Sequence, residues 1–547
     1  MTVHGVRATQ AGGARPSRAG AAAPGTLLGS TAAVTAGNLA SRATGFLRVL
    51  AVALALGTTF AGNTYQTANL VSNVLFELLA AGLLSSVLVP PFVRLLDGGR
   101  RREAERLAGA VLGVALAALG AVLVVGLVGR PLVMRAFTAA VDDPAVRRQE
   151  VALGSFLLIF FLPQLLLYAV GAVATGLLHG ARRFAAAAFA PVANNVVVIA
   201  TMVAFAAVQD GRPGLELGIA EKLVLALGTT AGVLAMTLVP VVALGRAGLR
   251  LRPRWDPGHP GLRALLRDGA WAAGLLSATQ LLLVTSLVLA NRVEGGVVAF
   301  HIAFQVFLLP FALAAHPVST ALYPRLASSA AARQWAEFRH DLAGGGATLA
   351  FLVLPASALL AAVAGPALRV IRLGNLDQAG AELAGRLVAA YALGLAGYAA
   401  FHLLVRASYA AGDARTPTLV GTAVAAGGAV LMVVLVAAGG DGPDRLVALG
   451  LGHSIAYLAG AAVLAVLLGR RTPADDGPSP FAALARSGAC ALAAGGAAWL
   501  VAQPFGEGRG QALAAVLTAT AVGGATYLLL QRASGAPELA WLRGRRP

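Results

Sequence analysis

The sequence predicts an all-α polytopic membrane protein, and three observations support that prediction. Charged residues make up only 12% of the 547 positions, against roughly 25% in an ordinary soluble domain. Hydrophobic residues make up 58%, which is more apolar surface than soluble cores could bury. The apolar residues are also grouped into segments that reach the length of about 20 residues needed to cross a bilayer as a helix.

About fourteen such segments follow one another, separated by short clusters of Gly, Pro and charged residues. Residues 1–25 precede them and consist mostly of Ala, Gly, Pro and Ser, so we expect a disordered tail there. The first span is interrupted by polar residues, which does not fit a cleaved signal peptide. The expected spans are centred near residues 42, 79, 119, 163, 196, 231, 278, 311, 352, 396, 427, 456, 491 and 520.

Arginine clusters recur in alternate loops, on one side of a fourteen-span topology. The positive-inside rule places these loops, and with an even span number both termini, in the cytoplasm. This topology accounts for the net charge of +18, and no basic stripe with interleaved aromatics points to nucleic acid. The clusters are Arg100, Arg101, Arg102 and Arg106; Arg182 and Arg183; Arg246, Arg250, Arg252 and Arg254; Arg325, Arg333 and Arg339; Arg470 and Arg471; and Arg543, Arg545 and Arg546.

Several function classes are disfavoured by single residues. The only cysteine, Cys490, excludes an intramolecular disulfide and a Cys-based zinc site, and the eight histidines are scattered, so we expect no metal and no cofactor. The only lysine, Lys222, is not part of a Walker-type ATP loop. Asp142 and Asp143 precede Pro144, a pattern typical of a helix cap rather than of catalytic carboxylates, so we expect a transporter and not an enzyme.

An internal repeat indicates two halves. Residues 79–90 align with residues 313–324 without a gap, at Leu, Ala, Ala, Ser, Ser/Thr, Leu and Pro. The two segments lie six spans apart, so the halves would share one orientation and be related by a pseudo-two-fold axis along the membrane normal. In transporters that symmetry places a substrate cavity between the halves. Chance similarity within an Ala- and Leu-rich sequence is the alternative.

The first span holds the most unusual residues of the chain. Arg42 and Arg48 each cost about 2.5–3.5 kcal/mol to insert in a membrane helix, so they need an anion, a cavity or a partner. Six residues separate them by roughly 9 Å along the helix and by about 120° around it. That spacing suits a graded path for an anion, and the guanidinium fork is well matched to phosphate.

The second span is also polar. Glu77 lies near its middle, at a depth similar to that of Arg42, so the two residues form either a structural ion pair or a gate that substrate opens. Gln66, Asn69 and Asn73 recur at helical spacing on the same span. They either line a wet surface or hold neighbouring helices together.

These residues carry a resemblance to a known family. Residues 41–48, Gly57, Asn73 and residues 80–90 resemble the opening of the MurJ (MviN) family of lipid II flippases, within the multidrug/oligosaccharidyl-lipid/polysaccharide exporter (MOP) superfamily. Further matches follow in order through most of the chain: Arg183 with Phe184, residues 189–191 with Asn195, residues 321–326, and Tyr409 with residues 413–417.

The resemblance implies a fold with about 14 transmembrane helices, in two six-helix lobes plus two C-terminal helices. The corresponding ranges are an N-lobe at residues 26–246, a C-lobe at 247–470, the two extra helices at 471–532 and a cytoplasmic tail at 533–547. It also implies a location in the bacterial plasma membrane. Partners would be undecaprenyl-pyrophosphate-linked saccharide (lipid II), membrane lipids and cell-wall synthesis or division proteins.

The implied function is movement of lipid II to the outer leaflet by alternating access, for cell-wall synthesis. Arg42 and Arg48 match the arginines of the family's first helix, which are thought to contact the anionic head group; Asn73 and Gln305 are further candidate binding positions. The alternatives are export of another lipid-linked polysaccharide unit or a drug, and a scaffold that recruits cell-wall enzymes without transport.

The sequence also departs from the family pattern. The acidic residue expected after the first helix is Asn63, and the basic residues expected in the second helix fall at Leu70, Phe76 and Glu77. The arginine expected in the eighth helix aligns with Gln305. The resemblance therefore implies a cavity with less charge than is usual in the family, and a divergent substrate or activity.

Overall fold

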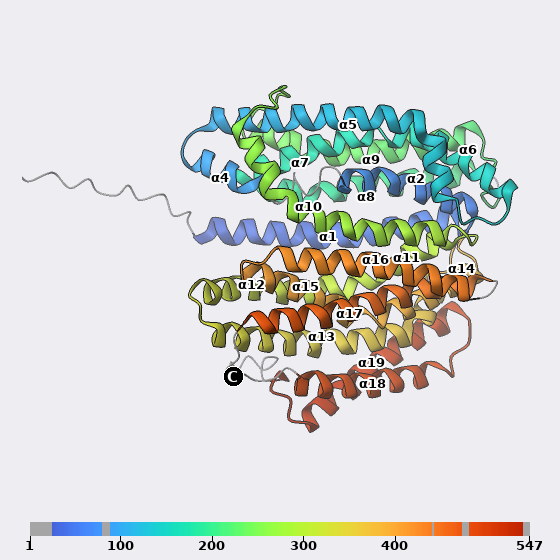
Figure 1. Cartoon of the computed structure of the whole chain (residues 1–547). Helices are drawn as coiled ribbons and strands as arrows, with labels where there is room; N and C mark the ends of the chain where they lie inside the picture. The colour runs from blue at the N-terminus through green and yellow to red at the C-terminus, as the bar shows by residue number, and fades with distance from the viewer. Residues whose placement is uncertain (1–23, 79–87, 210, 440–441, 473–480, 540–547) are drawn as a thin grey trace, which may run out of the picture.

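A computed structural model describes residues 24–78, 88–209, 211–439, 442–472 and 481–539; the side chains of residues 24–32, 263–273 and 275–276 are outside that description. The described residues fold into helices that lie roughly side by side (Figure 1). The chain enters at one end of this bundle, where α1 begins, and α1 ends at Leu56 at the opposite end. We call these the inner end and the outer end.

The helices fall into three groups along the chain. The first is α1 (Pro24–Leu56), α2 (Phe60–Phe76), α4 (Val89–Asp97), α5 (Arg101–Phe137), α6 (Pro144–Phe161), α7 (Gln164–Gly180), α8 (Ala185–Val208) and α9 (Ile219–Arg246). The second is α10 (Pro260–Ala290), α11 (Gly296–Pro310), the π-helix η2 (Phe311–Ala315), α12 (His316–Ala331), α13 (Trp335–Val370), α14 (Gln378–Ala392), α15 (Leu395–Ala410), α16 (Arg415–Ala438), the 3₁₀ turn η3 (Pro443–Leu446) and α17 (Val447–Arg471). The third is α18 (Phe481–Ala502) and α19 (Arg509–Ala533).

The expected membrane character is confirmed. Within the described ranges, 11 helical stretches are long and apolar enough to cross a membrane, and 12 if α14 and α15 count as one span bent by 48°. The expected span near residue 79 contains residues 79–87, which the structure does not describe. The expected span near residue 278 contains undescribed side chains at residues 263–273 and 275–276. The count of fourteen therefore stays a prediction. The first member of the predicted repeat, at residues 79–90, lies largely in the same undescribed part.

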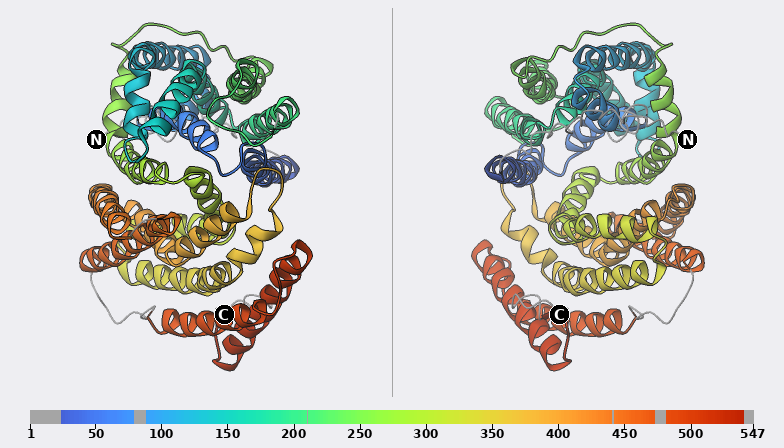
Figure 2. Two further views of the ribbon diagram at one scale, coloured as in Figure 1. Left: turned by 90° about the vertical axis from the view of Figure 1, so that its right-hand side faces the viewer. Right: turned by 90° about the vertical axis from the view of Figure 1, so that its left-hand side faces the viewer.

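The first two helix groups form two bundles that face one another, with the third group against the outside of the second bundle (Figure 2). We call these bundles the N-lobe and the C-lobe. The C-lobe is built around one large apolar core that includes Phe300, Phe307 and Tyr391. The N-lobe has two cores, one with Phe161 and Phe205 and one with Phe92.

Helix α1 lies between the lobes. It packs mainly on α8 of the N-lobe and also contacts α11 of the C-lobe. A β-carbon at Gly37 would lie 2.8 Å from the β-carbon of Ala188, so only glycine permits this close approach of α1 to α8. One face of α1 is thereby held against the N-lobe while another remains directed at the interface between the lobes.

Helices α18 and α19 pack on α13 through small residues. Ala494 and Ala498 of α18 are fully buried, and a β-carbon on Gly495 would approach the β-carbon of Ala358 to 2.9 Å. Such close contact between small side chains is the usual way in which helices associate in lipid, where no hydrophobic force drives them together.

Candidate functional site

A cavity of about 420 Å³ lies between the lobes, where α1 and α8 face α11. Arg42 and Arg48 line it from α1, and Gln305 lines it from α11. Three of the candidate binding residues therefore meet at one cavity, although Gln305 lies more than 250 residues from both arginines in the sequence. Its remaining lining residues are Asn38, Ser41, Gly45, Phe46, Pro191, Asn194, Asn195, Leu308 and Leu309.

The two arginines are alike in lacking a hydrogen-bond or ion-pair partner among the described residues. Neither guanidinium forms an ion pair or a side-chain hydrogen bond within the described part of the chain. Arg42 is exposed and Arg48 is half-buried. Arg42 and Arg48 therefore give the cavity two positive charges that no described acidic side chain neutralises, which is a costly arrangement inside a membrane protein.

Asn195 holds α1 in place beside the cavity. Its side-chain Nδ2 donates to the carbonyl O of Ser41 at 3.3 Å and to Oγ1 of Thr44 at 3.1 Å. These two bonds flank Arg42 in the sequence and tie its turn of α1 to α8. Asn195 is thus placed to position Arg42 relative to the cavity.

The other two candidate residues lie elsewhere. Asn73 donates from Nδ2 to the carbonyl O of Asn69 at 3.4 Å, within α2, and does not line the cavity. Glu77 forms no ion pair among the described residues, so the pairing with Arg42 that the sequence left open is not formed in this conformation. Because the Asn73 contact is made within α2, it decides neither of the two alternatives for the polar residues of that helix.

The outer end of the cavity is closed by contacts between the lobes, which we call the outer seal. Asn63 of α2 uses both ends of its amide there: Nδ2 donates to the carbonyl O of Val293 at 2.8 Å, and Oδ1 accepts from the N–H of Val297 at 3.0 Å. Asn291 adds a donor, from Nδ2 to Oγ1 of Thr67 at 3.1 Å. These three amide contacts connect α2 to the start of α11.

A second part of the outer seal joins the end of α1 to the C-lobe. Asn375 donates from its backbone N to Leu54 O at 3.0 Å and from Nδ2 to Ala55 O at 2.7 Å. Gly57 follows with φ +67°, and a β-carbon there would lie 2.5 Å from the carbonyl O of Asn375. Since Leu54 is six residues beyond Arg48, this contact lies about 9 Å from it along α1. Both arginines are thus on the inner side of the outer seal.

Ion pairs complete the outer seal. Arg212 of the N-lobe lies 3.3 Å from Asp377 and 3.8 Å from Glu294 of the C-lobe. Asp142 pairs with Arg292 at 2.9 Å and with Arg445 at 3.8 Å. The hydrogen bond from Arg292 holds the pKa of the Asp142 carboxyl below its ordinary value, and the charge of Arg445 acts in the same direction.

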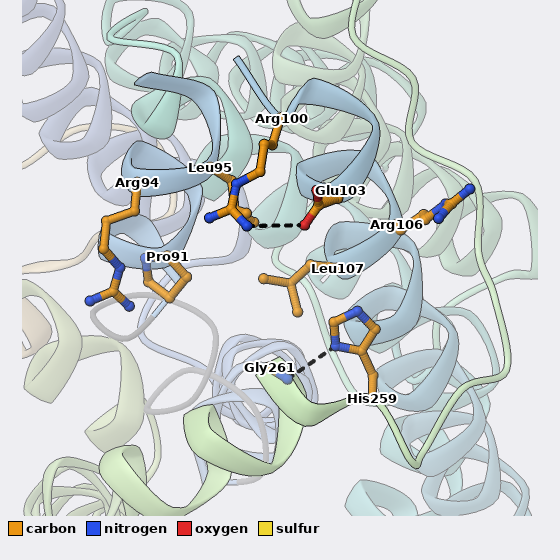
Figure 3. A pocket seen from close by; sticks show the side chains of 9 residues that line it. All are labelled: Pro91, Arg94, Leu95, Arg100, Glu103, Arg106, Leu107, His259 and Gly261. Carbon is orange, nitrogen blue, oxygen red and sulfur yellow. Dashed lines mark hydrogen bonds and ion pairs between the residues drawn. The ribbon is translucent and has the colours of Figure 1, made fainter. Parts of the chain in front are cut away.

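Another arginine-lined cavity, of about 490 Å³, lies at the inner end of the N-lobe (Figure 3). Arg94, Arg100 and Arg106 face it from α4 and α5, and His259 closes it from the start of α10. Arg100 already pairs with Glu103 at 3.3 Å, and His259 Nδ1 accepts from the N–H of Gly261. This cavity lies where the start of α10 meets α4 and α5, and it shares no lining residue with the cavity at Arg42 and Arg48.

The acidic pair tested for catalysis has structural roles. Asp143 Oδ1 accepts from the N–H of Ala145 at 2.7 Å and caps α6, as predicted, while Asp142 belongs to the outer seal. In the described part of the chain no group of three or more His, Cys, Asp or Glu could hold a metal ion. Among the described residues, the cavity thus combines two guanidinium groups with uncharged polar and apolar side chains.

Sequence reasoning missed residues that join distant segments. The polar character of the first span pointed to Asn38 and Ser41, but no local signal pointed to Asn194 as a cavity residue or to Asn375 as part of the outer seal. Asn195 was noted only as a match to the family pattern. The role of Asn195 depends on the packing of α8 against α1, which the spacing of residues along the sequence does not reveal.

The comparisons with known proteins agree with this architecture. The family profile described as lipid II flippase MurJ matches residues 52–508. A relative from Rhizobium meliloti (strain 1021), described as a probable lipid II flippase MurJ, is 28% identical over 400 residues, which are 72% of each chain. A solved structure described as lipid II flippase MurJ in an inward closed conformation superposes with a TM-score of 0.74 at 18% identity, over 91% of this chain and 97% of that one. An inward-facing MATE multidrug transporter of the MOP superfamily gives 0.64 at 14% identity, over 78% of this chain and 94% of that one.

Proposed function

This chain belongs to the MurJ family of lipid II flippases, and we propose that it carries the lipid II head group past the lobes through the cavity lined by Arg42 and Arg48. It is a transporter and not an enzyme. Lipid II is its substrate, and the undecaprenyl tail of that substrate remains among membrane lipids while the head group crosses. The product of transport supplies peptidoglycan synthesis.

One observation supports the assignment of the site. Arg42 and Arg48 are two charged groups on a membrane helix that no described residue pairs with, and both face one cavity between the lobes. A pyrophosphate offers each guanidinium a pair of oxygens. Gln305, where the family pattern has an arginine, presents an uncharged amide to the same cavity and suits the hydroxyl and amide groups of a saccharide.

The positions of the two arginines along α1 suggest an order of contacts. Arg42 lies nearer the inner end and is more exposed than Arg48, so the head group meets Arg42 first and is then passed to Arg48, about 9 Å further along the helix. Release on the other side requires the outer seal to open. The lobes then rock about α1, and residues 26–246 and 247–470 move as two bodies.

We further propose that the inner end faces the cytoplasm. The turns with Arg100, Arg182 and Arg333 lie at that end, as do the beginning of α1 and the end of α19 (Figure 1). Both termini are then cytoplasmic, and the membrane is the bacterial plasma membrane. Cell-wall synthesis or division proteins would meet the same arginine-rich face.

The test is complementation of a strain depleted of its lipid II flippase, by the wild-type chain and by Arg42→Ala and Arg48→Ala. We expect rescue by wild type only. In proteoliposomes each alanine variant should flip lipid II roughly tenfold more slowly or worse, since a hydrogen bond to a charged group contributes about 1.5–3 kcal/mol. Arg42→Lys and Arg48→Lys keep the charge but lose the fork, so intermediate rates are expected.

Arg102→Ala is the matched control, because Arg102 is exposed at the inner end and does not line the cavity between the lobes. Membrane expression of each variant is measured alongside. Equal flipping by Arg42→Ala and wild type would overturn the site. Failure of well-expressed wild-type protein to rescue growth would argue for another lipid-linked cargo or for a scaffold role.

A further inference from the structure

A fully buried carboxyl group lies behind the outer seal. Glu150 of α6 has no solvent-exposed surface. Its Oε1 accepts a hydrogen bond from Oγ1 of Thr64 on α2 at 3.2 Å, while its Oε2 is buried without any hydrogen-bond partner. The transport path through Arg42 and Arg48 makes no use of this group.

No cation compensates Glu150. Helix α6 packs against α2, α5, α7 and α9, and none of their titratable or charged side chains forms an ion pair or a hydrogen bond with it in the described part of the chain. An isolated carboxylate in such surroundings would cost several kcal/mol, so a group placed like this one takes up a proton instead. The titratable and charged side chains that these helices carry include Tyr65 on α2, Arg130 and Arg135 on α5, Tyr168 and His179 on α7, Glu221 and Lys222 on α9, and Arg147 and Arg148 on α6 itself.

Glu150 is connected to the outer seal through one helix. Thr64, its hydrogen-bond donor, follows Asn63 directly and lies one turn from Thr67. Asn63 and Thr67 are the α2 residues that bond to Val293, Val297 and Asn291 of the C-lobe. The same stretch of α2 therefore packs on the Glu150 carboxyl on one side and carries the outer seal on the other.

We propose that Glu150 is a proton-binding site whose protonation is required for the outer seal to close. Closure takes up one proton from the outer solution, and opening admits water to Glu150 and returns that proton to it. The neutral carboxyl lets α2 and α6 pack without an uncompensated charge, and the ionised form favours the conformation in which α2 moves away. The proton concentration of the outer solution then biases the lobes of the proposed flippase.

The sign of the pH dependence follows. The closed conformation holds the proton more tightly than the open one, so the closed fraction is high at low pH and falls as the pH rises. One proton changes the ratio of open to closed molecules by at most about tenfold per pH unit. Replacing Glu150 by Gln keeps the neutral shape, so this dependence disappears and the chain stays at the closed fraction that wild type shows at low pH.

The experiment uses the full chain in lipid nanodiscs, with Cys490→Ala and spin labels at Ala145→Cys and Ala379→Cys. Both label sites are exposed at the outer end, one on each lobe. Distance distributions are recorded from about pH 5 to pH 9, where an ordinary exposed carboxyl is already ionised. We expect the long, open distance to grow with pH in wild type and to stay constant in Glu150→Gln.

Glu150→Asp retains a titrating carboxyl and should retain a pH dependence, which protects the test against a variant that merely packs badly. Glu103→Gln, which neutralises an exposed inner-end carboxyl, should behave as wild type. An equal pH dependence in wild type and Glu150→Gln, or none in wild type, would overturn the proposal. The measurement contains no lipid II, so its failure leaves the proposed flippase function untouched, and a failed complementation leaves the proton site standing.

Discussion

At the scale of single residues, Asn63 shows how much depends on the chemistry of one side chain. The resemblance to the family implies an acidic residue near this position, whereas here an amide donates to Val293 and accepts from Val297. A carboxylate can accept from the N–H of Val297 but cannot donate to the carbonyl of Val293. The amide therefore makes this seal contact possible without titration.

Asn63→Asp should open the outer seal. The substitution replaces the hydrogen bond to the carbonyl of Val293 by two facing acceptors. This raises the free energy of the closed conformation by about 1–3 kcal/mol, which is roughly a tenfold to a hundredfold increase in the ratio of open to closed molecules. The label pair at Ala145→Cys and Ala379→Cys reports that ratio at neutral pH. Asn63→Ala, which removes both bonds without repulsion, should open the seal less; an Asp variant as closed as wild type would contradict this account.

At the scale of elements, the break between α14 and α15 has a specific partner. The two helices meet at an angle of 48°, which frees backbone carbonyls that a straight helix would satisfy. The Oγ of Ser454 on α17 donates to the carbonyl O of Ala390 at 2.9 Å, and the carbonyl O of Tyr391 lies 3.4 Å from the same Oγ. Gly394 lies directly against Ser454, where a larger side chain would clash. The bend is thus stabilised by a neighbouring helix.

Ser454→Ala should lower the apparent Tm of the purified protein. The substitution leaves a buried carbonyl without a donor, at a cost of about 1–3 kcal/mol. Thermal unfolding in detergent measures the loss. Ser534→Ala is a suitable control, because the Ser534 hydroxyl also bonds a backbone carbonyl but lies exposed after α19. Equal melting of the two variants would argue against a stabilising role at the bend.

At the scale of the whole molecule, the outer seal combines groups with opposite pH responses. Closing protonates Glu150 in our proposal, whereas Asp142 must be ionised to pair with Arg292 and Arg445. Closing lowers the pKa of Asp142 from its ordinary value of 3.8. The contribution of Asp142 to the stability of the closed conformation is therefore fully present above pH 3.8, and it is lost as the pH falls through the lower pKa of the closed state. The two responses therefore act in separate pH windows.

The closed fraction should consequently pass through a maximum and decrease again below about pH 4. Asp142→Asn should remove this acid limb and slightly weaken closure at neutral pH, as expected for an exposed ion pair. The same label pair measures both effects. Asp143→Asn is the neighbouring control, since Asp143 caps α6 and forms no ion pair within the described part of the chain. An acid limb that survives in Asp142→Asn would refute the assignment.

Much of the fold could be predicted without coordinates. Apolar segments of membrane length and alternate arginine loops predicted an all-helical membrane protein. The uneven polarity of the first span singled out Arg42 and Arg48 before any cavity was known. Glu150 was not singled out, because one carboxylate near the start of an apolar segment has the appearance of an ordinary helix-end residue. Only its burial against Thr64, 86 residues away, gives it significance.

The sequence by itself determined the helical class, the costly arginines of the first span and the resemblance to the family, because hydropathy, charge cost and local motifs are properties of short segments. Only the tertiary structure decided that Arg42, Arg48 and Gln305 share one cavity, that Asn73 and Glu77 do not join them, and that the outer end is closed. The reason is physical. The outer seal depends on contacts such as Asn375 with Ala55, 320 residues apart, whose geometry arises only when two separately packed lobes meet.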